Sequence, residues 1–327
     1  MSIERRLAAK ERSRKARTKA TVKKWAAILC LPVLAVIILS GYLIYKSVTT
    51  VNYSKYISKD GTIQGVSPRE CFSEFPNLDD VVIDIEPTDD EVQAKLKSTI
   101  QSLEEAAKDA SELETSENTT ETIDYLSHFN QEWVEQYAAD TLGDKYPLTE
   151  EGFLDYVTDL LREANKGNAK SYVSSYMEAH TAVKSYPFWF TKNQKKILAH
   201  DYEATFEQWK EYGLFGEYED YESYVLSIYE TKSAYRKSLK KDAKASTKTY
   251  LIWLTVFDEL NLTATIADSK AYEISRAGMT EATDEEKEKY WNSLVEEYGE
   301  PYLMLEYRQN AAMEALAAKV LAKMEAQ

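Results

Sequence analysis

The chain has 327 residues, of which 44% are hydrophobic, and its 55 Asp and Glu outweigh its 40 Lys and Arg to leave a formal net charge of −15. This length and composition are ample for a hydrophobic core, but ten glycines are too few for folds built on glycine turns, such as the Rossmann and P-loop folds. The three histidines, His128, His180 and His200, lie far apart and form no ligand pair, so we expect neither a zinc site nor any other cofactor.

Residues 25–45 (WAAILCLPVLAVIILSGYLIY) contain no charged side chain. As a helix they extend about 31 Å, enough to cross a hydrocarbon core of roughly 30 Å. Trp25 at one end and Tyr42 and Tyr45 at the other are suited to the two interfaces. The alternative is a cleaved signal peptide, but its apolar core is shorter, at roughly 7 to 15 residues, and ends in a small-x-small site. We therefore predict an uncleaved transmembrane helix over residues 25–45.

Residues 1–24 carry ten Lys or Arg and two Glu, a balance of +8, which leaves −23 for residues 46–327. The positive-inside rule then predicts a basic cytoplasmic tail and an extracytoplasmic C-terminal region, as in a single-pass protein of the cell membrane. Nucleic-acid binding is the alternative for such a tail, but beside a span its charge is more typical of a topology signal and of contact with anionic lipids. Because Cys30 lies in the span, Cys71 has no disulfide partner in the exported part, as is typical of a bacterial surface protein.

Residues 46–110 are expected to form an extended segment followed by a first helix. Asp60-Gly61 and Pro68 mark turns, and Val81–Ile85 (VVIDI) alternates in the manner of a short strand. Thr88-Asp-Asp-Glu91 is a capping box, in which each of the two outer side chains accepts a backbone N–H bond, and it predicts a helix from about Asp89. Residues 111–122 (SELETSENTTET) are polar, acidic and free of aromatics, which is typical of a linker.

Residues 123–327 show helical periodicity almost throughout. The expected helix starts are Thr149, a capping box Thr191-x-x-Gln194, Tyr221, and a further box Thr283-x-x-Glu286; the expected breaks are Gly167, Pro187, Gly213–Gly216 and Gly299-Glu-Pro301. Residues 251–260 (LIWLTVFDEL) are apolar enough for the buried centre of a helix. The predicted fold class is all-α: one N-terminal transmembrane helix followed by an elongated helical domain.

Acidic residues are so frequent that carboxylate pairs carry no catalytic signal, and no catalytic motif emerges, so no enzyme is predicted. The unusual residue is tyrosine, with 24 copies, many at spacings that suit a core. Two aromatic clusters, Tyr186-Pro-Phe-Trp-Phe190 and Trp209-x-x-Tyr212-x-x-Phe215, are too dense to be buried entirely, and an exposed remainder would be a protein-binding surface. The candidate binding residues are Phe188, Trp189, Phe190, Trp209, Tyr212 and Phe215.

The order of these segments resembles trigger factor. The stretches that carry the resemblance are YISKDG at 56–61 with VVIDIEPTDDEVQAKL, NQEWV at 130–134 with LTEEGFLDYVTDLLREA, YPFWFTKNQKKILAHDY, YGL at 212–214, LKKDAKASTKTYLIWLTVFDELNLTAT and VEEYG at 295–299. It covers residues 53–103 and 124–322, and it is a pattern of helix faces and breaks. The SurA-like and PrsA-like foldases share a similar helical module.

The chain departs from that family in two places. Where trigger factor carries a prolyl isomerase domain, only the linker stands between Leu103 and Ile123, and the ribosome-docking domain is replaced by the basic tail and the span. The resemblance therefore implies the C-terminal chaperone region alone, without active-site residues and displayed outside a membrane.

Two functions remain open at this point. One is a membrane-anchored chaperone that binds unfolded or newly exported polypeptides without prolyl isomerase activity. The other is an envelope scaffold or adaptor that uses the same helical domain to bind one dedicated protein partner.

Overall fold

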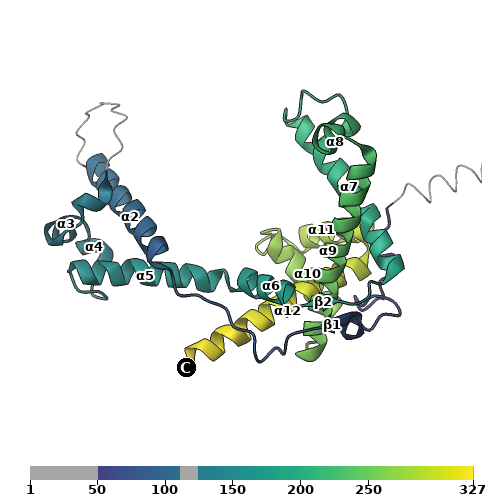
Figure 1. Ribbon diagram of the computed structural model, residues 1–327, viewed down its shortest axis with the longest axis horizontal. Coiled ribbons are helices and arrows are strands. Elements are labelled where there is room, and N and C mark those ends of the chain that lie inside the picture. Colours follow the sequence, from purple (N-terminus) through teal and green to yellow (C-terminus); the bar gives the residue numbers. More distant parts are fainter. Residues whose placement is uncertain (1–50, 111–123, 327) are drawn as a thin grey trace, which may run out of the picture.

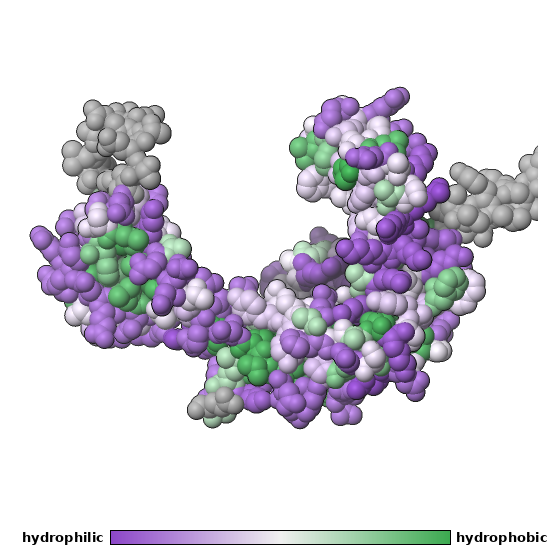
Figure 2. Space-filling view, in the orientation of Figure 1, coloured by the Kyte–Doolittle hydropathy of each residue, from purple (hydrophilic) through white to green (hydrophobic). Residues whose placement is uncertain are grey.

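A computed structural model describes residues 51–110 and 124–326, and 69% of these residues are helical against 3% in strands. The all-α expectation is therefore confirmed for the described part. The chain forms a central body from which two arms project on the same side (Figure 1). In the space-filling view the region between the arms is open (Figure 2).

The first arm, called the N-terminal arm, has a core of its own. Its elements are α2 (Asp89–Ala110), the 3-10 helix η2 (Tyr125–His128), α3 (Gln131–Tyr137), α4 (Ala139–Leu142) and α5 (Glu150–Gly167). Ile100, Val134 and Phe153 are fully buried between these helices. The predicted helix starts are confirmed, because Thr88 and Glu91 exchange capping hydrogen bonds and the Thr149 side chain accepts a bond from the Gly152 N–H.

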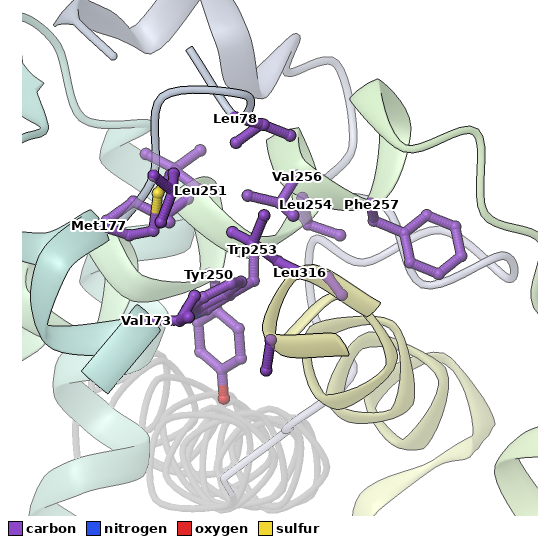
Figure 3. Close-up of a cluster of buried hydrophobic side chains, with 14 of the residues drawn as sticks. Leu78, Val173, Met177, Tyr250, Leu251, Trp253, Leu254, Val256, Phe257 and Leu316 are labelled. Atoms are coloured by element: carbon purple, nitrogen blue, oxygen red, sulfur yellow. The ribbon is translucent and has the colours of Figure 1, made fainter. Parts of the chain in front are cut away.

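The body is built around the second half of α9 (Lys232–Glu259). The elements that pack against it are α6 (Ala169–Ala179), α12 (Glu300–Glu325) and the first turns of α7 (Phe188–Glu211), while α10 (Ile266–Arg276) and α11 (Asp284–Tyr298) pack against α12. Leu251, Trp253 and Val256 are inaccessible to solvent, which confirms the predicted buried helix centre. Figure 3 shows side chains of α9 between Met177 of α6 and Leu316 of α12.

The second arm, called the α8 arm, consists of the outer half of α7, the short helix α8 (Tyr221–Tyr229) and the first half of α9 (Figure 1). α7 leads out from the body and α9 returns to it, so the connecting loop and α8 lie at the far end. The predicted turn over Gly213–Gly216 and the predicted start of α8 are both confirmed.

Residues 51–88 lie along the body in a mostly extended course. Within them are the 3-10 helix η1 (Pro68–Cys71) and strand β1 (Phe72–Glu74), which pairs antiparallel with β2 (Ala182–Val183). Cys71 is buried here and has a free thiol. The predicted strand at Val81–Ile85 is wrong: these residues are alternately buried and exposed, but they pair with no strand among the described residues. Their buried side chains pack on the body instead.

Two glycines allow this segment to approach α12 closely. Gly61 has φ +81°, and a Cβ there would lie only 2.7 Å from the backbone carbon of Met304. Gly299 has φ +82°, and a Cβ there would lie 2.3 Å from the Ser54 hydroxyl oxygen, which donates a 2.8 Å hydrogen bond to the carbonyl of Tyr298. Only glycine adopts such angles without strain, so both contacts require it.

One predicted cap is wrong. α7 begins at Phe188 after Pro187, so Thr191 and Gln194 lie inside the helix and do not form a capping box. The Thr191 N–H already donates a 2.9 Å helical hydrogen bond to the carbonyl of Pro187, the N-cap residue, so the helix has begun one turn before the Thr-x-x-Gln pattern.

The predicted basic tail (1–24), transmembrane helix (25–45) and linker (111–122) lie outside the described residues. Among residues 51–110 and 124–326, no helix combines the length and the apolar character needed to span a bilayer.

Candidate functional site

The six aromatic residues predicted to bind a partner fall into three separate places. Trp209, Tyr212 and Phe215 lie at the end of the α8 arm, whereas Phe188 and Trp189 lie at its base. Trp189 and Trp209 are 20 positions apart on one helix, a separation of about 30 Å. The structure therefore does not bring the predicted residues together into one site.

The prediction that Phe190 is an exposed binding residue is wrong. Its side chain is 1% exposed and belongs to the core of the body, where its ring meets that of Tyr250 edge to face at 5.8 Å. The helical turn explains the difference from its neighbours, because Trp189 and Phe188 point about 100° and 200° away from it, respectively, around α7. Phe190 is a packing residue.

The end of the α8 arm holds an open aromatic groove of about 270 Å³. Its wall comes from α7, the loop after it, α8 and the start of α9. We call it the α8-arm groove. Its lining residues are Tyr202, Thr205, Phe206, Trp209, Phe215, Tyr221, Tyr224, Val225, Ile228, Tyr229 and Tyr235.

A stack of rings forms the floor of this groove. Phe206 is 2% exposed, and its ring stacks on Phe215 at 5.6 Å and on Tyr224 at 5.1 Å. Trp209 continues the stack beyond Phe215 at 6.3 Å. Phe215 has φ +59°, which is rare for a bulky residue, so its ring is placed by a strained turn that the stacking stabilises.

The rim of the groove is apolar and accessible. Trp209 is 47% exposed and Tyr212, in the adjoining loop, is 76% exposed. Leu214 and Ile228 beside them are 49% and 53% exposed. A concentration of large exposed apolar side chains on one structural element marks a binding surface.

Two tyrosine hydroxyls inside the groove are hydrogen bonded to each other, those of Tyr221 and Tyr235 at 2.8 Å. Burial raises the pKa of both phenols above the usual value near 10. They therefore stay protonated at neutral pH, and the wall of the groove stays uncharged.

The charge around the groove is strongly negative. Residues 201–230 contain nine Asp or Glu and a single Lys, whereas residues 184–200 contain four Lys and no Asp or Glu. Glu203, Glu207 and Asp220 line a neighbouring hollow on the same arm, together with Lys232 and Arg236 from the start of α9. The outer half of the α8 arm is therefore acidic on balance, because acidic residues of α7, the loop and α8 outnumber the basic residues at the start of α9, and its base is basic.

Most of the groove was not predicted from the sequence. Of its eleven lining residues, only Trp209 and Phe215 are among the six candidates of the sequence analysis. Tyr221, Tyr224 and Tyr235 recur around α8, and this density of tyrosine was the available signal. The signal does not separate core from surface, because a tyrosine ring suits both.

The base of the arm has two hollows beside Phe188 and Trp189, which are 65% and 58% exposed. One, of about 210 Å³, is lined by Tyr186, Phe188 and several lysines, and the other, of about 180 Å³, includes Trp189, Lys55 and Lys196. Figure 2 shows an apolar area at the surface of the N-terminal arm. Two leucines in this part of the chain, Leu148 and Leu160, are 41% and 37% exposed.

No family model, no curated protein and no solved structure matches the chain. The resemblance to trigger factor thus rests on the residue patterns described above, and it stays a prediction.

Proposed function

We propose that this protein is a membrane-anchored extracytoplasmic chaperone that holds unfolded or newly exported polypeptides and catalyses no reaction on them. The observation that carries the proposal is the open α8-arm groove, whose rim exposes Trp209, Tyr212, Leu214 and Ile228 at the end of a projecting arm. Unfolded chains expose apolar side chains, and a groove of this kind can cover them.

Aromatic walls suit a binder of many sequences. Burial of each apolar client side chain contributes about 1.5 to 3 kcal/mol, and this contribution does not depend on a particular sequence. Stacked rings also offer rigid contact area at little cost in side-chain entropy. The acidic surroundings keep such an apolar surface soluble and favour clients with Lys and Arg next to their apolar segments.

The two-arm shape supports the same function. The N-terminal arm and the α8 arm project on one side of the body, and both carry apolar surface (Figures 1 and 2). A client bound at the α8-arm groove would therefore lie beside the open space between the two arms.

The test measures aggregation of several unrelated denatured proteins in the presence of the full chain in phospholipid nanodiscs. We expect the wild-type protein to slow aggregation, and to do so still at about 0.5 M salt, because the attraction is apolar and is not screened. A Trp209→Ser, Tyr212→Ser variant should lose the effect. A matched Phe188→Ser, Trp189→Ser variant removes exposed aromatics at the base and should keep it.

Circular dichroism must show that both variants remain helical. A folded protein that leaves every client's aggregation unchanged, yet retains one partner stoichiometrically, would replace the chaperone with the dedicated scaffold. If only the Phe188→Ser, Trp189→Ser variant fails to slow aggregation, the client site lies at the base of the arm.

The proposed topology is tested separately with a membrane-impermeant maleimide. Cys71 is buried, so a Ser98→Cys variant supplies the exposed thiol on α2. It should react in intact cells if the body is extracytoplasmic, and full protection of this thiol would contradict that location.

Absence of isomerase activity is a further expectation. The full chain in nanodiscs should leave the cis–trans exchange of an X-Pro peptide at its uncatalysed time of tens to hundreds of seconds. Acceleration by the protein at micromolar concentration would show that residues 103–123 have been misinterpreted.

A further inference from the structure

A surface at the base of the α8 arm combines exposed aromatic rings with six lysines from three segments of the chain. We call it the lysine–aromatic surface; its members line the two hollows at the base of the arm. Its aromatic members are Phe188 and Trp189, and its basic members are Lys55, Lys192, Lys195, Lys196, Lys240 and Lys244.

These lysines have no carboxylate counter-ion in the part of the chain that the structure describes. None of the six lies within ion-pair distance of a carboxylate among residues 51–110 and 124–326, whereas Lys170 and Lys319 elsewhere on the body each have such a partner. Most other lysines of the described residues are also without an ion pair, and what distinguishes these six is that they share two hollows whose lining contains no Asp or Glu. A concentrated, uncompensated positive charge favours a polyanionic partner.

The aromatic rings and the lysines are mixed within this surface. Phe188 and Trp189 meet edge to face at 4.8 Å, and the Lys192 ammonium lies 5.4 Å from the Trp189 ring centre. Trp beside Lys is the combination found where proteins meet the headgroup layer of a bilayer, since the ring enters the interface and the long lysine stem keeps its charge in water.

The chain enters the described structure next to this surface. Asn193 of α7 donates a 2.9 Å hydrogen bond from its side-chain nitrogen to the carbonyl of Asn52, and Tyr53 donates a hydrogen bond to Asp201 further along α7. The predicted span ends at Tyr45, and the residues between it and Val51 reach at most about 20 Å when fully extended. The base of the α8 arm is thus tethered close to the bilayer.

We propose that the lysine–aromatic surface binds the anionic phospholipid headgroups of the membrane in which the chain is anchored. This inference rests on the proposed membrane location. The six ammonium groups pair with lipid phosphates, and Phe188 and Trp189 enter the interface.

The binding would set the orientation of the whole protein. The acidic end of the arm lies about 30 Å from Trp189 along α7, which is well beyond the Debye length of about 8 Å at physiological salt. Repulsion between that end and the anionic membrane therefore does not oppose binding at the base. The α8-arm groove is held away from the bilayer, where it is free to receive a client.

The test is lysine footprinting of the full chain in nanodiscs, with acetylation by an N-hydroxysuccinimide ester and readout at each lysine by mass spectrometry. Discs of phosphatidylcholine alone are compared with discs containing about one-third phosphatidylglycerol. We expect acetylation of the six lysines to be at least threefold slower in the anionic discs. The exposed Lys97 of α2 and Lys289 of α11 should react equally in both.

A charge-reversal pair supplies the control. In a Lys192→Glu, Lys196→Glu variant, protection of Lys240 and Lys244 by the anionic discs should disappear. The matched Lys97→Glu, Lys289→Glu variant changes the net charge equally and should keep the protection.

Equal acetylation of the six lysines in the two discs would overturn the proposal, as would protection that appears only when an unfolded client is added. The predicted transmembrane helix is tested independently, by extraction of the membranes at alkaline pH. A chain released by that treatment contradicts the predicted span, and the lysine rates measured with the same anionic discs still decide whether the surface binds lipid.

Discussion

Phe190 and Trp189 are adjacent in the sequence and have opposite surroundings. Phe190 is buried in the body against Tyr250, and Trp189 is 58% exposed at the base of the α8 arm. The two side chains therefore have different roles despite their similar chemistry, and only burial separates them.

Substitution by alanine should therefore change the free energy of unfolding by different amounts at these two positions. Phe190→Ala should lower the free energy of unfolding by about 3 to 5 kcal/mol, because it leaves a cavity in the core. Trp189→Ala should change it by no more than about 0.5 kcal/mol, as is usual for exposed positions. Urea unfolding followed by circular dichroism measures both, and equal losses would place Trp189 in the core.

The surroundings of Glu306 in α12 predict that the stability of the protein depends on pH. Burial raises the pKa of its carboxyl above the usual 4.5, although hydrogen bonds from the Tyr250 and Tyr302 hydroxyls act in the opposite direction. Since the folded pKa is the higher one, folding favours the protonated form. The stabilising contribution is complete below about pH 4.5 and is lost as the pH rises through the folded pKa.

Glu306→Gln should remove this dependence, because the amide stays neutral and its oxygen still accepts a bond from Tyr250. The variant and the wild type should be equally stable near pH 4, and the variant should be the more stable at pH 7. The measurement is the free energy of unfolding in urea across that range. Glu296→Gln on the exposed face of α11 is the control, and the same pH profile for both variants would contradict the assignment.

At the scale of single elements, α11 begins with a complete capping box. The Thr283 hydroxyl accepts a bond from the Glu286 N–H at 3.3 Å, and the Glu286 carboxylate accepts one from the Thr283 N–H at 2.9 Å. α7 has no such cap, and the Thr191 hydroxyl inside it is buried without a hydrogen-bond partner among the described residues.

Substitution of Thr283 should therefore lower the free energy of unfolding, whereas substitution of Thr191 should not. Thr283→Ala should cost about 0.5 to 2 kcal/mol and increase amide hydrogen exchange in the first turn of α11. Thr191→Val should leave stability unchanged or raise it, since it replaces an unpaired buried hydroxyl by a methyl group of similar size. A substantial loss of stability in Thr191→Val would show that this hydroxyl has a partner after all.

At the scale of the whole molecule, the N-terminal arm has its own core and few attachments to the body. One is the passage from α5 into α6, and another is an ion pair between Arg162 and Glu86 at 2.8 Å. Asn165 adds a 3.0 Å hydrogen bond to the carbonyl of Ile85. Regions joined by so few contacts unfold separately, with different free energies.

Phe153→Ala should therefore weaken the N-terminal arm alone. Hydrogen exchange measured by mass spectrometry should rise throughout α2 to α5 and stay unchanged in α9 and α12. Leu305→Ala, which opens a cavity in the core of the body, should have the reverse effect. A uniform rise in both variants would mean that arm and body form one cooperative unit.

The sequence by itself determined the features that depend on near neighbours. The caps at Thr88, Thr149 and Thr283 were predicted correctly because a capping hydrogen bond joins residues no more than three positions apart. The buried centre of α9 was predicted correctly because an uninterrupted apolar run has no solvent-facing side. The all-α class follows from many such local signals acting together.

Only the tertiary structure decided what depends on distant parts of the chain. β1 pairs with β2 across more than a hundred residues, while Val81–Ile85, which alternates like a strand, packs on helices instead. The α8-arm groove joins rings from three helices, and the lysine–aromatic surface joins Lys55 to α7 and α9. The physical reason is that the periodicity of a helix predicts which side chains share a face, but which face is covered depends on the elements that pack against it. Trp189 and Phe190 are therefore distinguished by the fold alone.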